Sequence, residues 1–174
     1  MPATLRLLPL ACLIAATPLI ARPAPASSAS AALSTANGTD AGYAVIGVER
    51  GKVVMTISLH GLSEGPHGLH LHTVGTCGAA GFTAAGGHLN PDGRKHGTSN
   101  PAGSHLGDLP NVVADAAGKA SAKMTLTGTP KALFAALFDA DGTAIVVHAG
   151  PDDYVTDPTG NSGGRIACGA FKAN

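Results

Sequence analysis

Short runs of aliphatic and β-branched residues, separated by segments rich in glycine, asparagine and aspartate, constrain the fold of this chain most strongly. Residues 43–48 and 52–60 are two such runs, and residues 49–51 between them predict a hairpin. Similar runs predict further strands at 66–72, 111–115, 120–127, 143–148 and 165–171. The chain also has 24 glycines and 12 prolines but no tryptophan, which is typical of a protein with many turns. We therefore predict an all-β fold, an antiparallel sandwich or barrel of about eight strands.

Two stretches without strand patterns interrupt this succession, at about residues 73–107 and 149–164. Long structureless loops in a compact domain are usually functional. Nearly all potential metal ligands lie in these two loops or at their edges, so we expect a rigid β scaffold that carries its site on loops. Residues 130–137 form the one plausible helical turn, and they could instead belong to a long connection.

The first 31 residues differ from the remainder. Arg6 precedes an apolar run over residues 7–20, and an Ala/Pro/Ser stretch without acidic residues follows. This pattern predicts a secretory signal peptide and a flexible N-terminus over 1–31, followed by a single domain over 32–174 and a periplasmic or secreted location. Cleavage points lie anywhere from Ala21 to about Ala32. A retained anchor or a lipoprotein signal at Cys12 are the less favoured alternatives, and we expect no stable membrane association after cleavage.

Removal of this segment leaves 9 basic and 11 acidic residues, a formal charge of −2, and nothing in that balance indicates nucleic-acid binding. It also leaves two cysteines, Cys77 and Cys168, in an exported and therefore oxidising setting. We expect them to pair. Two unrelated buried thiols are the alternative.

His70-Leu71-His72 is the strongest functional signal in the sequence. Alternate side chains of a strand project to the same face, so His70 and His72 can coordinate one metal ion together. Three imidazoles and a carboxylate, from His88, His96, His105 and Asp108, make a four-coordinate set suited to zinc. An imidazole-only set from strand ends suits copper, and the remaining histidines of this kind are His70, His72 and His148.

Two four-coordinate sites need one ligand more than these residues supply, so one imidazole must serve twice. His88 is the natural candidate, because it lies between the two groups in the sequence and an imidazole can bind a metal at each nitrogen. His60 and His67 are spare histidines that leave this count open. His67 falls on the strand face opposite His70, so we expect it to hydrogen-bond to loop backbone.

Four ordered motifs carry a family resemblance: residues 65–72, 87–91, 105–108 and 163–169. With them the chain resembles copper/zinc superoxide dismutase of the bacterial exported type, over about residues 43–171. The resemblance implies a Greek-key β fold and the activity of that family, with superoxide as substrate. It also implies one copper and one zinc per subunit, and it supports the Cys77–Cys168 disulfide.

The same resemblance implies roles for individual residues. Copper would be held by His70, His72, His88 and His148, and zinc by His88, His96, His105 and Asp108, with His88 as the bridge and as a proton carrier. Arg165 would dock the superoxide anion, because a guanidinium stays charged and presents a fixed fork of donors. Asp152 would orient one copper-binding and one zinc-binding imidazole from outside the ligand sets, and His67 would also lie in this outer layer.

The chain departs from better-known eukaryotic members in its short last loop, where only residues 154–158 lie between Asp153 and Thr159. Attraction of the substrate would then fall to Arg94, Lys95 or other lysines. Three rival functions remain: a dismutase-like module that binds metal without turnover, a copper-only enzyme, and a structural zinc protein. The sequence leaves monomer and homodimer both open.

Overall fold

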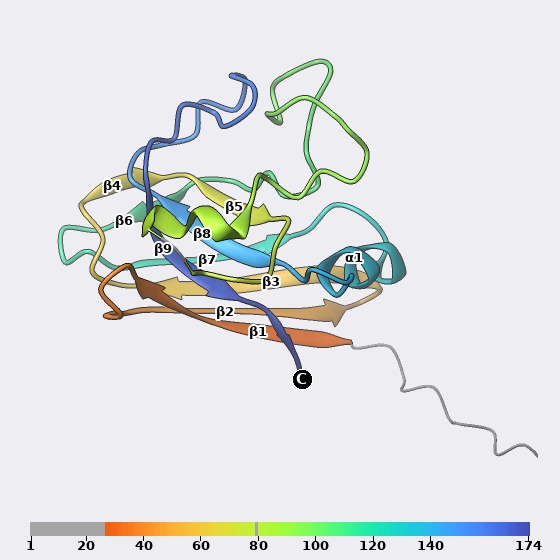
Figure 1. Cartoon of the computed structure of the whole chain (residues 1–174), viewed down its shortest axis with the longest axis horizontal. Helices are drawn as coiled ribbons and strands as arrows, with labels where there is room; N and C mark the ends of the chain where they lie inside the picture. Colours follow the sequence, from red (N-terminus) through yellow and green to blue (C-terminus); the bar gives the residue numbers. More distant parts are fainter. Residues whose placement is uncertain (1–26, 79) are drawn as a thin grey trace, which may run out of the picture.

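The computed structural model of the protein describes residues 27–78 and 80–174, and in this part of the chain strands dominate (Figure 1). The expected signal peptide falls almost wholly outside the described residues. The strands are β1 (Ser28–Thr35), β2 (Asp40–Glu49), β3 (Lys52–Leu59), β4 (Gly65–His67), β5 (Leu69–His72), β6 (Val112–Ala114), β7 (Ala120–Thr125), β8 (Ala144–His148), β9 (Arg165–Ala170) and β10 (Lys172–Ala173). One 3-10 segment, η1 (Ala80–Ala85), and one helix, α1 (Pro130–Leu137), accompany them.

The strands form a curled antiparallel sheet in the order β5-β8-β9-β1-β2-β3-β7, with β10 beside β1, and a second sheet of β4 and β6. The last long strand, β9, pairs with the first, β1, and β3 pairs with β7. Of the strands between β3 and β7 in the sequence, β4 and β6 form the second sheet, and β5 pairs with β8 at the other edge of the main sheet. These crossings give the all-β, barrel-like architecture that the strand pattern and the resemblance predicted. Figure 1 shows the two long loops projecting from the same side of the strands.

The core lies on the inner face of the curled sheet, where Ile46, Met55, Ile57 and Leu71 are fully buried. Strand β8 is buried along its whole length. Ile145 belongs to the main core, whereas its neighbours in the strand pack with Phe82 and Cys168 in a second, smaller apolar cluster. The continuous apolar run that predicted β8 therefore reflects a strand covered on both faces.

Most of the expected strands are confirmed. The predicted hairpin joins β2 and β3 through Arg50 and Gly51, both at positive φ, with Glu49 paired to Lys52. The single strand expected over 66–72 is instead two, because the chain changes partner at Gly68: β4 pairs with β6 and β5 with β8. The helix at 130–137 is confirmed, and the Thr129 hydroxyl caps it by accepting from the Ala132 N–H at 3.3 Å.

Three elements were not anticipated, one of which is the two-residue strand β10, beyond the strand predicted over 165–171. Strand β1 begins at Ser28, so regular structure starts inside the segment that was assigned to the N-terminus, ahead of the domain boundary expected at residue 32. Its Ala and Ser residues alternate between buried and half-exposed positions, but they lack the β-branched side chains that mark a strand in sequence. Segment η1 lies within the first long loop. Among the described residues no helix is long and apolar enough to cross a membrane.

Candidate metal centre

Strand β5 positions the first cluster of imidazoles. His70 and His72 lie two residues apart on this strand and are both buried, and His148 ends the neighbouring strand β8. The backbone of Leu71 between them binds both arms of the first long loop: its N–H donates to the Gly107 carbonyl at 2.9 Å, and its carbonyl accepts from the Leu89 N–H at 2.8 Å. These bonds bring the loop residues His88 and Asp108 beside the two strand histidines.

Four ring nitrogens in this first cluster are buried and have no hydrogen-bond partner: His70 Nδ1, His72 Nε2, His88 Nε2 and His148 Nε2. One ring nitrogen from each of these histidines lies within 4.8 Å of the others. A buried nitrogen without a partner is costly, and four that converge on one point are explained by an ion that all of them bind. An all-imidazole set is a good match for copper.

The opposite nitrogens of these imidazoles are held by the surrounding chain. His70 Nε2 lies 2.7 Å from Asp152 Oδ2, His72 Nδ1 donates to the Gly86 carbonyl at 3.0 Å, and His148 Nδ1 donates to the Gly163 carbonyl at 3.1 Å. Each ring is thereby fixed in orientation and tautomer. Burial lowers the pKa of His72 to about 3 and that of His148 to about 4, so both rings stay neutral and keep the lone pair that a metal needs.

The second cluster surrounds one carboxylate oxygen. Asp108 Oδ1 lies 3.1 Å from His88 Nδ1, 3.0 Å from His96 Nδ1 and 3.2 Å from His105 Nδ1. His105 Nδ1 and His88 Nδ1 are 3.4 Å apart. Ligands on a tetrahedral zinc with bonds of about 2.0 Å are separated by about 3.3 Å, so these spacings match the edges of such a site. The donor set therefore fits zinc.

His70 also approaches this second cluster, since one of its nitrogens lies within 4.8 Å of ligand atoms of His88, His96 and Asp108. Its two nitrogens are already engaged, Nε2 with Asp152 and Nδ1 toward the first cluster. The Nδ1 of His105 lies 3.2 Å from Asp108 Oδ1 and 3.4 Å from His88 Nδ1, which makes His105 the better fourth ligand. His88 alone has one nitrogen in each cluster.

Asp152 links the two clusters from outside. Its side chain is fully buried, with Oδ2 2.7 Å from His70 Nε2 and Oδ1 3.0 Å from His96 Nε2. Burial by itself would raise the pKa of this carboxyl, but the hydrogen bonds from His70 and His96 outweigh it and lower the pKa below its usual value. One ionised carboxylate thus contacts an imidazole of each cluster.

The two spare histidines lie outside both clusters. His67 is buried, with its Nδ1 2.7 Å from the His148 carbonyl oxygen and its Nε2 2.9 Å from the Ser63 carbonyl oxygen and 3.3 Å from the Ser63 hydroxyl. It therefore joins the end of β8 to the turn before β4. His60 is half-exposed beside Asp40, at 3.3 Å.

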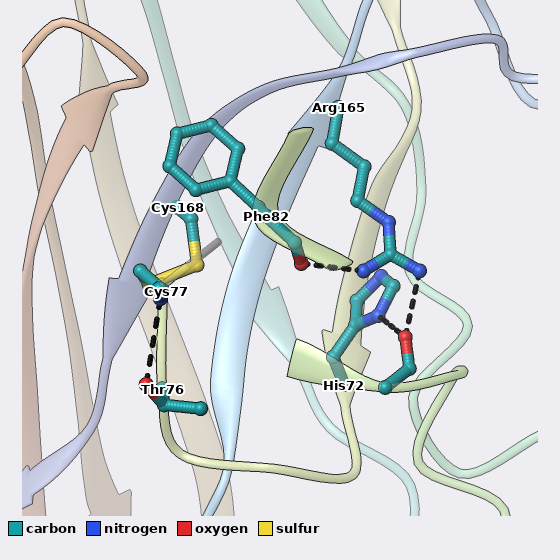
Figure 2. Close-up of a disulfide and its surroundings, with 8 residues drawn as sticks. His72, Thr76, Cys77, Phe82, Arg165 and Cys168 are labelled. Carbon is teal, nitrogen blue, oxygen red and sulfur yellow. Dashed lines mark hydrogen bonds between the residues drawn. A yellow bond between two sulfur atoms is a disulfide. The ribbon is translucent and has the colours of Figure 1, made fainter. Parts of the chain in front are cut away.

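Arg165, at the start of β9, is aimed at the first long loop (Figure 2). Its Nη1 donates to the Phe82 carbonyl at 2.7 Å and its Nη2 to the Gly86 carbonyl at 2.6 Å, the same carbonyl that holds His72. The expected disulfide is present: Cys77 is bonded to Cys168, which ties this loop to β9. The guanidinium and the first cluster are thus fixed to a common stretch of backbone.

A pocket of about 420 Å³ opens onto both clusters, and Arg165 and Arg94 are the two cations that line it. His72, His88, His105 and His148 lie in its wall, as does Asp157. Of the two residues considered for substrate attraction, Arg94 thus reaches the pocket. Lys95 instead forms an exposed ion pair with Asp157 at 3.0 Å.

Asn111 and Gly160 are among the residues of this centre that the sequence analysis missed. Asn111 binds the backbone of Asp152 through its side-chain amide. Gly160 packs against the contact between Asp152 and His96. Neither residue type indicates in sequence that it positions a metal ligand. Gly160 is one of 24 glycines, and Asn111 is marked only by its place between Pro110 and a strand.

Comparison with known proteins identifies relatives of this arrangement. The family model of copper/zinc superoxide dismutase matches residues 41–171. The Cu-Zn superoxide dismutase of Caulobacter vibrioides is 41% identical over 151 residues, which cover 83% of this chain and 86% of that protein. Cu-Zn superoxide dismutase 2 of Aquifex aeolicus is 45% identical over 105 residues, which cover 59% of this chain and 61% of that protein.

Solved structures show the same likeness. A superoxide dismutase-like protein from Bacillus subtilis superposes with a TM-score of 0.75 at 37% identity, covering 81% of this chain and 96% of that chain. The Cu/Zn superoxide dismutase of Brucella abortus superposes with a TM-score of 0.67 at 28% identity, covering 83% and 99%.

Proposed function

The chain belongs to the copper/zinc superoxide dismutase family and is an enzyme of this type with copper and zinc as cofactors, and we propose how its own residues perform the reaction. In this proposal the first cluster holds copper through His70, His72, His88 and His148. The second cluster holds zinc through His88, His96, His105 and Asp108. The four unpartnered, buried nitrogens of the first cluster are the observation that carries the assignment.

Bound copper supplies the one-electron chemistry by which two superoxide ions and two protons become dioxygen and hydrogen peroxide. Arg165 supplies the docking site for the anion, because it lines the pocket shared with His72, His88 and His148. Its hydrogen bonds to the Phe82 and Gly86 carbonyls support this role, since they hold a charged group in place without neutralising it.

His88 joins the two sites in this proposal. Its Nδ1 lies 3.1 Å from Asp108 Oδ1 in the second cluster, while its Nε2 is one of the unpartnered nitrogens of the first. Such a ring can hold a proton at Nε2 while Nδ1 keeps it in place, so we assign His88 the delivery of one of the two protons. The second cluster uses all four of its ligands to order the loop, which leaves the chemistry to the first.

We also propose that the enzyme acts outside the cytoplasm, in the periplasm or as a secreted protein, in antioxidant defence. The N-terminal sequence pattern and the disulfide support export. Cleavage of the signal peptide would precede Ser28, because the Ser28 carbonyl accepts from the Asn174 N–H and Ser28 pairs with Gly47. Intact mass of the mature protein tests this, and a mature chain that begins beyond β1 would contradict it.

One preparation separates the enzyme from its rivals. Copper and zinc are measured per chain by elemental analysis, and superoxide loss is followed by pulse radiolysis. The proposal expects one copper, one zinc and rapid superoxide loss that disappears in the metal-free protein. Metal uptake without catalysis would favour a metal-binding module. His88→Ala should lower both copper and zinc occupancy, and unchanged occupancy of both would contradict the bridge.

A further inference from the structure

A single residue immediately before β6, Asn111, binds the second long loop at three points. Its side-chain Nδ2 donates to the Asp152 carbonyl at 2.9 Å, and its Oδ1 accepts from the Asp152 N–H at 2.9 Å. Its own backbone N–H donates to the Tyr154 hydroxyl at 2.8 Å. One amide group thus satisfies both backbone groups of Asp152, and the peptide beside it holds the residue two positions further on.

The residue that is clamped in this way is the one that links the two clusters. The buried carboxylate of Asp152 contacts His70 Nε2 on one side and His96 Nε2 on the other. Residues 149–164 contain no strand or helix, so the backbone of Asp152 has no regular ladder to fix it. Its place is set by side chains and isolated backbone bonds, and Asn111 supplies the pair that acts on Asp152 directly.

We infer that Asn111 is a positioning residue that couples the two metal sites by fixing Asp152 between His70 and His96. The hydrogen bonds of Asn111 go to Asp152 and Tyr154 and not to either imidazole, so it acts through the carboxylate. When the clamp is removed, the carboxylate loses its fixed distance to both rings, so both metals bind more weakly. This inference rests on the proposed ligand assignment, and it names a residue outside either ligand set.

The loss of metal affinity expected in an Asn111 variant can be estimated from other proteins. Removing a group that orients a metal-binding histidine typically weakens metal binding about 10–100-fold. Asn111→Leu keeps the volume of this half-buried side chain but removes both amide bonds, and Asn111→Ala removes the side chain altogether. We expect either variant to lower zinc and copper affinity within that range, as measured on the folded, metal-stripped protein by competition with a chelator.

Asn100→Ala is the matched control. Asn100 lies in the first long loop, and its side-chain Nδ2 donates to the Val155 carbonyl of the second long loop at 3.3 Å. Like Asn111 it therefore binds the backbone of the second loop, but its partner there is not Asp152. Its replacement should leave both affinities within about threefold of the wild-type values.

A double-mutant cycle separates positioning from a general loss of structure. If Asn111 acts through Asp152, Asn111→Leu should have no further effect on zinc affinity in an Asp152→Ala background. Cobalt bound in place of zinc gives a second readout, because its visible spectrum should change in Asn111→Leu and stay unchanged in Asn100→Ala.

Two results would overturn the inference: a folded Asn111→Leu protein with wild-type affinities for both metals, or losses that simply add to those of Asp152→Ala. A failure of the proposed function would be seen in the wild-type protein and not only in the variants. In that case the wild-type protein itself would bind no copper or would leave superoxide decay unaltered.

Discussion

Gly160 occupies a position where the structure has no room for a side chain. A methyl carbon built on it would overlap Asp152 Oδ1 and would lie 2.6 Å from His96 Nε2. The residue is also at a φ of +63°, a conformation that L side chains rarely adopt. Gly160→Ala should therefore displace the Asp152 carboxylate from His96, a contact that measures 3.0 Å in the wild-type protein.

The expected loss combines two terms. The left-handed backbone costs about 1–2 kcal/mol for a residue with a side chain, and this term lowers stability whether or not metal is bound. Loss of a hydrogen bond to a charged group costs about 1.5–3 kcal/mol. Since His96 is a proposed zinc ligand, this second term should appear in zinc binding, where it corresponds to about a 10–100-fold weaker affinity.

Gly38 provides the matched control, because it too has a positive φ, of +83°, but a methyl group there would meet no atom within 4 Å. Gly38→Ala shares the backbone cost without touching the metal centre. Zinc affinity of both metal-stripped variants is measured by chelator competition, together with their unfolding in urea. A Gly160→Ala protein whose zinc affinity is within threefold of wild type, or matches that of Gly38→Ala, would refute the reasoning.

Three further outcomes follow from the same geometry. Replacing Cys77 and Cys168 together should lower the free energy of unfolding by about 4–5 kcal/mol, because their bond closes a separation of 91 residues; a loss below about 1 kcal/mol in urea denaturation would contradict this. Arg94→Gln should slow the reaction with superoxide severalfold at low ionic strength and flatten its salt dependence, while Arg94→Lys should not; identical salt profiles would count against attraction by this residue. In metal-free protein the lowered pKa values of His72 and His148, about 3 and about 4, keep both rings neutral when folded, so the unfolded state binds more protons below about pH 6.5. The free energy of unfolding should therefore decrease as the pH is lowered, by about 2 kcal/mol for each ring at about pH 5. Denaturant curves measured in EDTA that do not change between neutral pH and about pH 5 would refute this.

The strand pattern was readable from sequence wherever runs of β-branched and larger aliphatic side chains mark it. The hairpin at Arg50 and Gly51 followed from such runs and their turn residues. Strand β1 was not predicted, because its Ala and Ser residues have little strand preference of their own and are held by pairing with β2 and β9. The break at Gly68 was missed for a similar reason, since a change of sheet partner leaves no local mark on an apolar run.

Candidate metal ligands were predictable because few residue types bind metal and their spacing is constrained. His70 and His72 follow from the two-residue period of a strand. The groups that orient these ligands were only partly predictable. Asp152 came from the family resemblance, whereas the Gly86 carbonyl and the amide of Asn111 act through contacts between segments far apart in the chain. Backbone carbonyls carry no residue signature, so sequence cannot name them.

These outer contacts also distinguish the ligands from one another. His96 Nε2 lies 3.0 Å from the buried carboxylate of Asp152. The corresponding nitrogen of His105 is 4.0 Å from Asp157, whose side chain is one-third exposed and already accepts from the His96 N–H and from Lys95. A contact of that length fixes neither the ring nor its tautomer. His105 is therefore the least constrained ligand of the second cluster. Three ligands of the first cluster lie on strands β5 and β8, whereas the second cluster takes its ligands from the first long loop and its edge and depends on how well the two long loops hold each other.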